Sequence, residues 1–256
     1  MVKEISVVII VKNGAKTIRW TLDSLKDFEE VVVFNNGSTD ETESICKSFD
    51  NVKFIEGEFT GFGSTKNTAI SYAKYDWILS LDCDEVLSKT LRYEIEKLSL
   101  DTQTVYRLRR DNYYANRVMR CCGWDNDYVY RLFNRNTTSF KEQLVHESLE
   151  TKGLHSIKLR EPIQHYPYEN IDNLLLKVQR YSTLYALEHQ GKKNPTVWGA
   201  FTRAWFAFIK HYFFQKGFLY GYEGVLISVT NANHVFYKYM KLIEVQRDKN
   251  RRIYES

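Results

Sequence analysis

Two aspartates at the end of an apolar run are the residues in this sequence best suited to chemistry. Residues 77–81 form a short apolar segment, and Asp82 and Asp84 follow it with one residue between them. Such a run predicts a buried strand, and ligands bind at the carboxyl ends of strands in an open parallel sheet. Two carboxylates there would suit Mg²⁺ or Mn²⁺, which take further ligands from water and a substrate phosphate. The alternative is that both aspartates cap the next helix.

The N-terminal part of the sequence alternates apolar runs with helical patterns. This alternation predicts an α/β fold with a parallel sheet and right-handed crossovers. The predicted strands cover residues 5–11, 31–34, 52–55 and 77–81, and the predicted helices cover 15–26, 41–49, 66–73 and 87–98. Ser38 and Glu41 fit the pattern of a capping box for the second helix, and residues 61–63 are predicted to form a loop.

The pattern changes after Leu100. Residues 104–109 and 128–134 alternate between apolar and polar side chains, which predicts strands of a mixed or antiparallel extension. Seven arginines lie between Arg107 and Arg135, either as a solvated basic face or as a rim that meets an anionic acceptor. Three helices are then predicted over residues 170–190, 197–215 and 225–245, and they are rich in aromatic residues.

Composition places the chain among soluble globular proteins. It has 256 residues, a formal net charge of +4 and 43% hydrophobic residues. This mild charge does not require a nucleic-acid partner. The four cysteines form no C-x-x-C pair, which favours free thiols in a reducing compartment. We find no secretory signal and no apolar run of transmembrane length, so we expect a cytoplasmic location.

Polar loops follow the predicted strands. Lys12 and Asn13 come after the first strand, and residues 35–40, which include a Gly-Ser-Thr-Asp turn, come after the second. Backbone N–H groups and hydroxyls at the start of a helix could bind a ribose or a base, although a plain helix cap is the alternative. Lys66 and Asn67 lie near a helix start, where the lysine is either solvated or, beside a metal, able to hold a diphosphate.

These segments together resemble family 2 glycosyltransferases, and most closely their lipopolysaccharide-core branch, which contains a β-1,4-glucosyltransferase. The resemblance spans nearly the whole chain, and the ordered set of motifs is specific although each piece is weak. It rests on residues 6–13, 36–40, 61–63, 66–67 and 76–85, and later on 123–124, 131–133, 145–147, 217–219, 238–239 and 241–242.

The resemblance implies a GT-A fold, a Rossmann-like and mainly parallel sheet flanked by helices. Together with the change of pattern after Leu100 and the aromatic-rich C-terminal helices, it divides the chain into a nucleotide-sugar-binding half (1–100), an acceptor and catalytic part of the same domain (101–165) and a helical, aromatic-rich C-terminal lobe (166–256). A divalent metal, Mg²⁺ or Mn²⁺, would be held by the D-x-D motif. Asp84 would be the direct ligand and Asp82 would face the ribose or the metal. The implied nucleotide and substrate contacts are Val11, Lys12, Asn13, Asn35, Gly37, Ser38, Asp40, Gly63, Lys66, Asn67, Asp82, Cys83 and Arg131.

Two positions depart from the family pattern. Asn35 stands where the family usually has Asp, and Gly14 where it often has Glu. An amide at position 35 can still form hydrogen bonds, but it changes how the base or ribose is held.

An inverting transfer also needs a general base that takes the proton of the acceptor hydroxyl. We favour Glu147, with Asp127 as the rival. His146 is either a third metal or diphosphate ligand or a buried, hydrogen-bonded histidine.

The leading hypothesis is an inverting, metal-dependent glycosyltransferase that moves a hexose from a nucleotide sugar, such as a UDP-hexose, to a cell-envelope glycolipid or oligosaccharide such as the lipopolysaccharide core. Alternatives are a transferase for capsule or protein glycans, a nucleotidyltransferase, and a non-catalytic nucleotide-sugar-binding module. A nucleotidyltransferase would normally carry a Gly-rich basic loop after the first strand, and residues 12–14 are too short for that. The C-terminal lobe is either a packed cap over the sheet or, with its aromatic and basic residues, a peripheral contact with the inner face of an anionic membrane.

Overall fold

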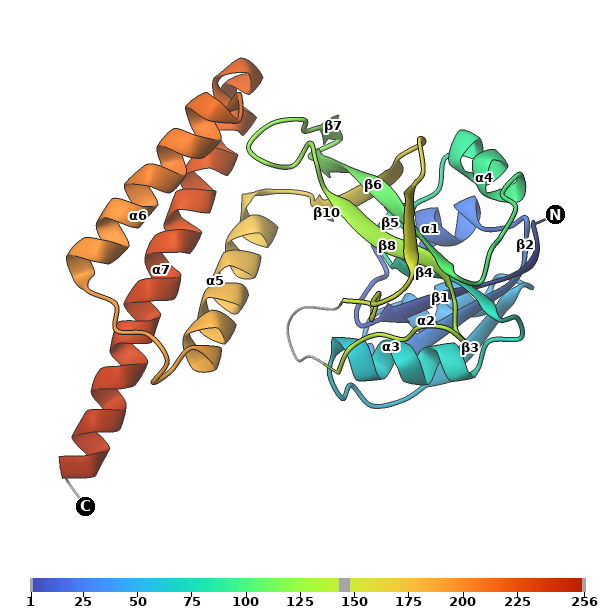
Figure 1. Ribbon diagram of the computed structural model, residues 1–256, viewed down its shortest axis with the longest axis horizontal. Helices are drawn as coiled ribbons and strands as arrows, with labels where there is room; N and C mark the ends of the chain where they lie inside the picture. Colours follow the sequence, from blue (N-terminus) through green and yellow to red (C-terminus); the bar gives the residue numbers. More distant parts are fainter. Residues whose placement is uncertain (1, 143–147, 255–256) are drawn as a thin grey trace. The chain divides into compact units, whose positions relative to one another are not determined.

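The computed structural model describes residues 2–142 and 148–254 (Figure 1). The chain divides into two compact units, one made of residues 1–111 and 126–166 and the other of residues 112–125 and 167–256. The three functional parts expected above, with boundaries near residues 100 and 165, stay a prediction. None of the described helices has the length and apolar character needed to cross a membrane.

Parallel strands form the N-terminal half of the sheet in the first unit. Strand β1 (Val2–Val11) pairs in parallel with β2 (Phe28–Asn35) and with β4 (Trp77–Asp82). On the far side of β2, β3 (Val52–Glu56) is also parallel. The strands are apolar on both faces because helices cover both sides, as is typical of parallel sheets.

Antiparallel strands extend this sheet beyond β4. Strand β8 (Tyr128–Asn134) pairs antiparallel with β4 and with β6 (Thr104–Tyr114). Strand β10 (Ile163–Tyr168) pairs antiparallel with the two-residue strand β5 (Glu85–Val86), and β9 (His155–Lys158) runs parallel to β6. Over the described residues the order is β3-β2-β1-β4-β8-β6-β10-β5.

Side chains that alternate along the strands build a core on each face of the sheet. Helices α1 (Ile18–Ser24), α2 (Thr42–Lys47) and α4 (Lys89–Glu96) contribute to one core cluster. Helix α3 (Phe62–Ser71) contributes to the other and lies on the opposite side of the sheet in Figure 1. Burial of these apolar side chains, at about 25 cal/mol per Å², holds the strand ends in place.

Helices make up most of the second unit. Helices α5 (Ile171–Glu188) and α6 (Val197–Ile209) both pack along α7 (Gly221–Tyr254). A π-helical turn, η1 (Lys210–Phe214), and a 3₁₀ turn, η2 (Gly217–Tyr220), connect α6 to α7. Part of this unit's core comes from the segment around the short strand β7 (Arg117–Val118), where Met119, Cys121 and Cys122 are buried.

The connection between α6 and α7 depends on a close approach of two glycines. A Cβ atom added to Gly224 would lie 1.8 Å from the carbonyl oxygen of Gly217. This distance leaves no room for any side chain at position 224. The glycines that break the apolar pattern here therefore serve the turn between two packed helices.

The predicted fold class, a mainly parallel mixed sheet flanked by helices with a helical C-terminal region, is confirmed. Several local predictions were wrong. Residues 62 and 63 begin α3 and do not form a loop, and Ser38 does not cap α2, because its hydroxyl accepts a hydrogen bond from the Asn13 N–H group at 2.8 Å. The final helix begins at Gly221, before the expected residue 225, and α6 ends in a π-helical turn.

Candidate active site

Asp82 and Asp84 lie where the sequence places them, at the carboxyl end of a parallel strand. Asp82 is the last residue of β4 and stands opposite Ile10 in β1, while Asn35 at the end of β2 stands opposite Val11. The N-cap of the next helix, α4, is Ser88, whose hydroxyl accepts a hydrogen bond from Leu91 N–H. The alternative that the two aspartates cap this helix is therefore wrong.

A buried network of charges surrounds Asp82. Lys66 on α3 places its Nζ 2.9 Å from Oδ1 of Asp82, and Arg131 on β8 pairs through Nη2 with Oδ2. The same Nη2 atom lies 2.6 Å from Oε1 of Glu85, and Oε2 of Glu85 accepts a hydrogen bond from the Asp82 N–H group at 3.1 Å. Two cations thus balance two carboxylates in a region where unpaired charge would be costly.

Burial in this network is unequal, and that inequality matters for chemistry. The side chains of Lys66, Arg131 and Glu85 are at most 1% exposed, whereas the side chain of Asp82 is 31% exposed. Burial alone would raise the pKa of the Asp82 carboxyl, but the charges of Arg131 and Lys66 outweigh it and hold that pKa well below its usual range. Asp82 therefore stays a carboxylate at neutral pH and faces the open side of the network.

A second arginine extends the network along β6. Arg110 donates from Nε to Oδ2 of Asp127 at 2.8 Å, and its Nη1 lies 3.7 Å from Oε1 of Glu85. Asp127, one of the two predicted general bases, is thus held next to the same cluster as Asp82. Glu85 and Arg110 were not among the predicted site residues. The signal that could have found Glu85 is its position directly after the D-x-D motif.

His165 lies beside Asp84 and was also missed. It is a residue of β10, and its Nε2 lies 3.6 Å from Oδ1 of Asp84. Backbone pairing fixes this position, because His165 stands opposite Glu85 in the β5–β10 ladder and the Tyr166 N–H group donates to Asp84 O at 2.9 Å. No sequence signal predicts it, since β5 has only two residues and its partner lies about 80 residues further on.

The loops after β1 and β2 are joined by hydrogen bonds. The Asn13 side-chain oxygen accepts from the Thr39 N–H group at 2.8 Å, and Asp40 accepts from the Ala15 N–H group at 3.0 Å. Asn13 has φ of 55°, and such left-handed backbone is tolerated better by Asn than by most residues. The predicted nucleotide contacts in the two loops are therefore held close together, at the edge that also carries Asp82.

The two departures from the family pattern both have a local structural setting. Asn35 is buried, and its side-chain oxygen accepts from the Ser38 N–H group at 3.2 Å. A Cβ atom at Gly14 would lie 2.6 Å from a Val11 methyl group and 3.3 Å from the Cys83 sulfur. A larger residue at position 14 would therefore displace the Val11 side chain and press against Cys83, which stands between the two aspartates.

Cys83, in the middle of the motif, is not placed for reactive chemistry. Burial raises the pKa of its thiol, and the charges of Asp84 and Asp82 raise it further. The thiol is therefore protonated at neutral pH, and its backbone carbonyl accepts a hydrogen bond from Thr21 at 3.0 Å. Cys83 thus positions the motif against α1.

Other predicted site residues have structural partners or lie elsewhere. Asn67 forms two hydrogen bonds with the backbone of Phe140, at 2.8 and 2.9 Å, and so joins α3 to the segment after β8. Gly63 is buried in the first turn of α3, Lys12 is exposed and Gly37 has φ of 74°. Glu147 and His146 lie outside the described residues.

The arginines between residues 107 and 135 divide into several groups. Arg131 and Arg110 belong to the network, Arg135 pairs with Asp76 at 3.0 Å, and Arg117 pairs with Glu223 at 2.9 Å. Arg107 lies over the rings of Tyr128 and Tyr130. Arg131 is buried and so cannot belong to a solvated basic face, whereas Arg117 and Arg120 are exposed. Whether the exposed arginines form a solvated face or a rim that meets an anionic acceptor stays a prediction.

The side chains at this edge include hard oxygen donors and an imidazole. Within residues 2–142 and 148–254, no group of three or more His, Cys, Asp or Glu side chains comes together as a metal site. Mg²⁺ often binds one or two carboxylates and takes the remaining ligands from water and substrate phosphates, and Mn²⁺ also suits carboxylate and water ligands. Asp84 offers such a carboxylate, with the His165 imidazole 3.6 Å from it, whereas both oxygens of Asp82 already accept from cations.

The α/β sheet carries its paired aspartates at the carboxyl edge, where ligands bind in folds of this class, and comparison with known proteins identifies the family. The model of "Glycosyl transferase family 2" matches residues 6–147, more than half of the chain. The chain therefore belongs to family 2 of the glycosyltransferases and is an enzyme of that kind.

Relatives and solved structures agree with this family. An uncharacterized glycosyltransferase of Rickettsia bellii is 30% identical, over 98% of this chain and 90% of its own length. The lipopolysaccharide core biosynthesis glycosyltransferase LpsC of Rhizobium meliloti is 24% identical, over 94% of this chain and 92% of its own. The mannosyltransferase PcManGT of Pyrobaculum calidifontis, solved with GDP-Man and Mn²⁺, has a TM-score of 0.58 at 14% identity, over 94% of this chain and 87% of its own. The predicted GT-A fold is thereby confirmed.

Proposed function

We propose that this glycosyltransferase inverts the anomeric centre as it transfers a hexose from a nucleotide diphosphate sugar, a UDP-hexose, to a glycan of the cell envelope. The observation that carries the proposal is the arrangement at the end of β4. Asp84 stands beside His165 there, and Asp82 is kept ionised by Lys66 and Arg131. Such a site could hold a metal–diphosphate group and leave the sugar facing the acceptor.

Asp84 and His165 are the residues that we propose as protein ligands of Mg²⁺ or Mn²⁺. When bound, such a metal neutralises the charge that develops on the departing diphosphate. The structure of PcManGT with GDP-Man and Mn²⁺ supports a divalent metal for this fold. Asp82 has a different proposed role, because Lys66 and Arg131 occupy its two oxygens and fix its orientation. It would accept a hydrogen bond from a ribose hydroxyl.

The loops after β1 and β2 are proposed to hold the nucleoside. Asn13, Ser38 and Asp40 fix the backbone of the two loops against each other. Preorganised loops of this kind lower the entropic cost of holding a nucleotide. Asn35 offers an amide in place of the usual carboxylate, so it can both donate and accept a hydrogen bond.

Two carboxylates remain candidates for the general base. Asp127 is held by Arg110 at 2.8 Å, close to the charge network, and Glu147 is proposed from the sequence motif. The test is to compare Glu147→Gln with Asp127→Asn in transfer to acceptor and in hydrolysis of donor alone. Loss of the base should abolish transfer and leave donor binding intact, whereas the other variant should keep most of its turnover.

The acceptor that we propose is the lipopolysaccharide or lipooligosaccharide core. Support comes from the relative LpsC, whose name assigns it to lipopolysaccharide core biosynthesis. Capsule and protein glycans are the alternatives for the same chemistry. A cytoplasmic location is part of the proposal, supported by four cysteines that are all free thiols.

The experiment that tests the proposal measures release of nucleoside diphosphate from a panel of UDP-, GDP- and ADP-sugars. Each donor is assayed with Mn²⁺, with Mg²⁺ and with a chelator, and Asp84→Ala is assayed in parallel. Slow hydrolysis of one donor, abolished by the chelator and by the substitution, supports the proposal and names the sugar. A flat panel without any donor-induced thermal shift would overturn the proposal, because neither donor hydrolysis nor donor binding would have been found.

A further inference from the structure

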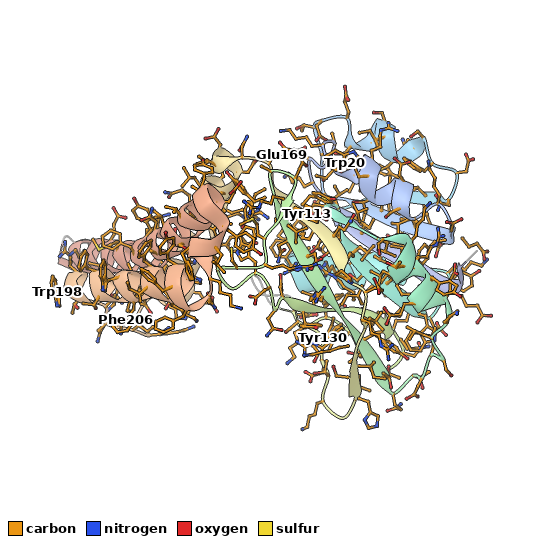
Figure 2. All side chains as sticks on the ribbon, turned by 90° about the horizontal axis from the view of Figure 1, so that it is seen from above. Trp20, Tyr113, Tyr130, Glu169, Trp198 and Phe206 are labelled. Atoms are coloured by element: carbon orange, nitrogen blue, oxygen red, sulfur yellow. The ribbon has the colours of Figure 1, made fainter. Side chains whose placement is uncertain are left out.

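Helix α6 exposes most of its large aromatic side chains, whereas an ordinary amphipathic helix buries such residues. The only residue of α6 that is buried is Ala200, and Ala204 and Ala207 are half-buried. The large aromatic residues are exposed, including Trp198 and Phe206, each at 73%. Figure 2 shows both side chains at the periphery of the helical unit. Small residues, together with the half-buried Phe208 and Ile209 at the end of the helix, thus face the protein, and the other large apolar residues face outward.

Further exposed apolar residues follow in the two turns after α6 and at the start of α7. We call the set the aromatic face, and it consists of Trp198, Phe201, Trp205, Phe206, Phe213, Phe214, Phe218, Leu219 and Tyr222. Single exposed apolar residues are normal on proteins, but many of them gathered in one region indicate an interaction site. Each large side chain left in water forgoes the stabilisation that burial would give. The face therefore needs an apolar partner to explain its composition.

Some rings of this face are ordered by contacts with one another or with the half-buried Tyr212. The ring of Trp198 stacks on that of Phe201, with centroids 5.6 Å apart. Tyr212 contacts Phe213 edge to face at 5.0 Å and Phe218 at 6.4 Å. A surface whose rings are already ordered loses less side-chain entropy when it is covered.

Charge distinguishes among partners for this face. Between Glu188 and Glu223 the sequence contains no Asp or Glu and five basic residues, which are Lys192, Lys193, Arg203, Lys210 and Lys216. All five are exposed. Amphipathic helices with aromatic residues on one face and Lys or Arg around it are typical of attachment to the interface of anionic membranes. Cations near such a surface add to the affinity.

A second copy of the chain is a poorer partner for the same face. In a two-fold dimer each copy presents the same patch to the other. The cations of both copies would then meet, and the carboxylates nearest to them in the sequence are Glu188 and Glu223, of which Glu223 already pairs with Arg117 at 2.9 Å. Like charges brought together across an interface oppose association. Phosphate headgroups, in contrast, supply the missing negative charge and acyl chains supply the apolar phase.

We propose that the aromatic face binds the surface of an anionic phospholipid bilayer. Helix α6 has 13 residues, too few to span a bilayer but enough to lie in its interface. Trp and Tyr side chains suit the headgroup level, where one end of the ring is apolar and the other is hydrated. The inference stands independently of the transfer reaction, because it concerns attachment alone.

Sedimentation with vesicles tests the proposal on the full chain. Binding is measured with vesicles of phosphatidylcholine alone and with vesicles that also contain phosphatidylglycerol, at low and high salt. The first variant is Trp198→Ala/Trp205→Ala/Phe206→Ala, which removes exposed rings. Its matched control is Trp20→Ala/Tyr93→Ala, which removes exposed rings from α1 and α4 in the other unit.

Two charge-reversal variants complete the design. Lys210→Glu/Lys216→Glu reverses two cations next to the aromatic face, and Lys26→Glu/Lys47→Glu reverses two exposed cations of the first unit. Circular dichroism and thermal unfolding establish that each variant is folded. Sedimentation velocity without lipid measures the oligomeric state of each protein.

The proposal predicts stronger binding to the anionic vesicles than to phosphatidylcholine, weakened by salt. The triple aromatic variant should bind at least about tenfold more weakly, since burial of even one of its three rings contributes about that factor. The charge reversal should reduce binding at least about fivefold on anionic vesicles alone, and both control variants should bind like the wild type. Equal sedimentation with and without anionic lipid, or unchanged binding by the triple variant, would overturn the proposal. A dimer that the triple variant dissociates, with no vesicle binding by the wild type, would assign the face to a second copy.

Discussion

Arg131→Met tests whether the charge network holds the carboxyl edge of the sheet together. Arg131 is 1% exposed and contacts two carboxylates, those of Asp82 and Glu85. Met preserves most of the side-chain volume and removes the charge. Glu85 would then remain fully buried, with Arg110 at 3.7 Å as its nearest described cation.

Removing one partner of a buried ion pair costs about 3–5 kcal/mol, because a buried charge is left uncompensated. For a protein of this size, 1 kcal/mol corresponds to about 2–4 °C in the midpoint of thermal unfolding. We therefore expect Arg131→Met to lower that midpoint by about 10 °C and to shift urea unfolding of the first unit accordingly. Circular dichroism with urea and with heat measures both.

A control comes from an ion pair in the same unit that is exposed on both sides. Lys26 and Asp23 lie 2.7 Å apart with side chains 62% and 45% exposed, so Lys26→Met should cost less than about 1 kcal/mol. The double variant Arg131→Met/Glu85→Gln removes the stranded charge and should recover about 1–3 kcal/mol relative to Arg131→Met alone. Equal destabilisation by Arg131→Met and Lys26→Met, or no recovery in the double variant, would refute the reasoning.

Three further predictions concern the same chain. Asp84→Asn and His165→Ala should each lower donor hydrolysis, measured as nucleoside diphosphate release at saturating Mn²⁺, about 100-fold or more. The midpoint of thermal unfolding should stay nearly unchanged in both variants. Wild-type rates of hydrolysis in both would contradict the assignment. The folded-state pKa of Asp82 is lowered, so the stability that its ionised carboxyl contributes is present above its unfolded pKa of about 3.9 and is lost as the pH falls through the lower folded value. The difference in unfolding free energy between wild type and Asp82→Asn should therefore shrink below about pH 4. A difference that grows on acidification would contradict this. Gly224→Ala should destabilise the chain by about 1–3 kcal/mol in urea unfolding, since its Cβ would lie 1.8 Å from Gly217 O, and a neutral result would show that this turn can open.

The sequence predicts the parallel half of the sheet well because the signal there is local. Apolar runs over 5–11 and 77–81 are buried on both faces, and such runs are strong predictors of parallel strands. The D-x-D aspartates lie at the carboxyl edge for the same reason. Helix ends were less predictable, as the π-helical turn after Ile209 shows, because local backbone geometry depends on packing against α7.

The parts of the site that sequence reasoning missed depend on long-range pairing. His165 reaches Asp84 only through the two-residue strand β5, which carries no periodic signal. Lys66 was predicted either to be solvated or to hold a diphosphate, and the structure instead pairs it with Asp82 at 2.9 Å. The sign and number of charges around a carboxylate depend on which strands are neighbours. The order of β8 and β6 in the sheet cannot be predicted from the sequence of either strand alone.

Coupled binding of Mn²⁺ and UDP is the most direct measurement of the central claim, that Asp84 and His165 hold a metal–diphosphate group. Calorimetric titration of UDP into the full chain, with Mn²⁺ and with chelator, gives the coupling for the wild type and for Asp84→Asn. We expect Mn²⁺ to tighten UDP binding at least about tenfold in the wild type, a coupling of about 1.4 kcal/mol, and hardly at all in Asp84→Asn. Equal UDP affinity with Mn²⁺ and with chelator, or undiminished coupling in the variant, would contradict the account.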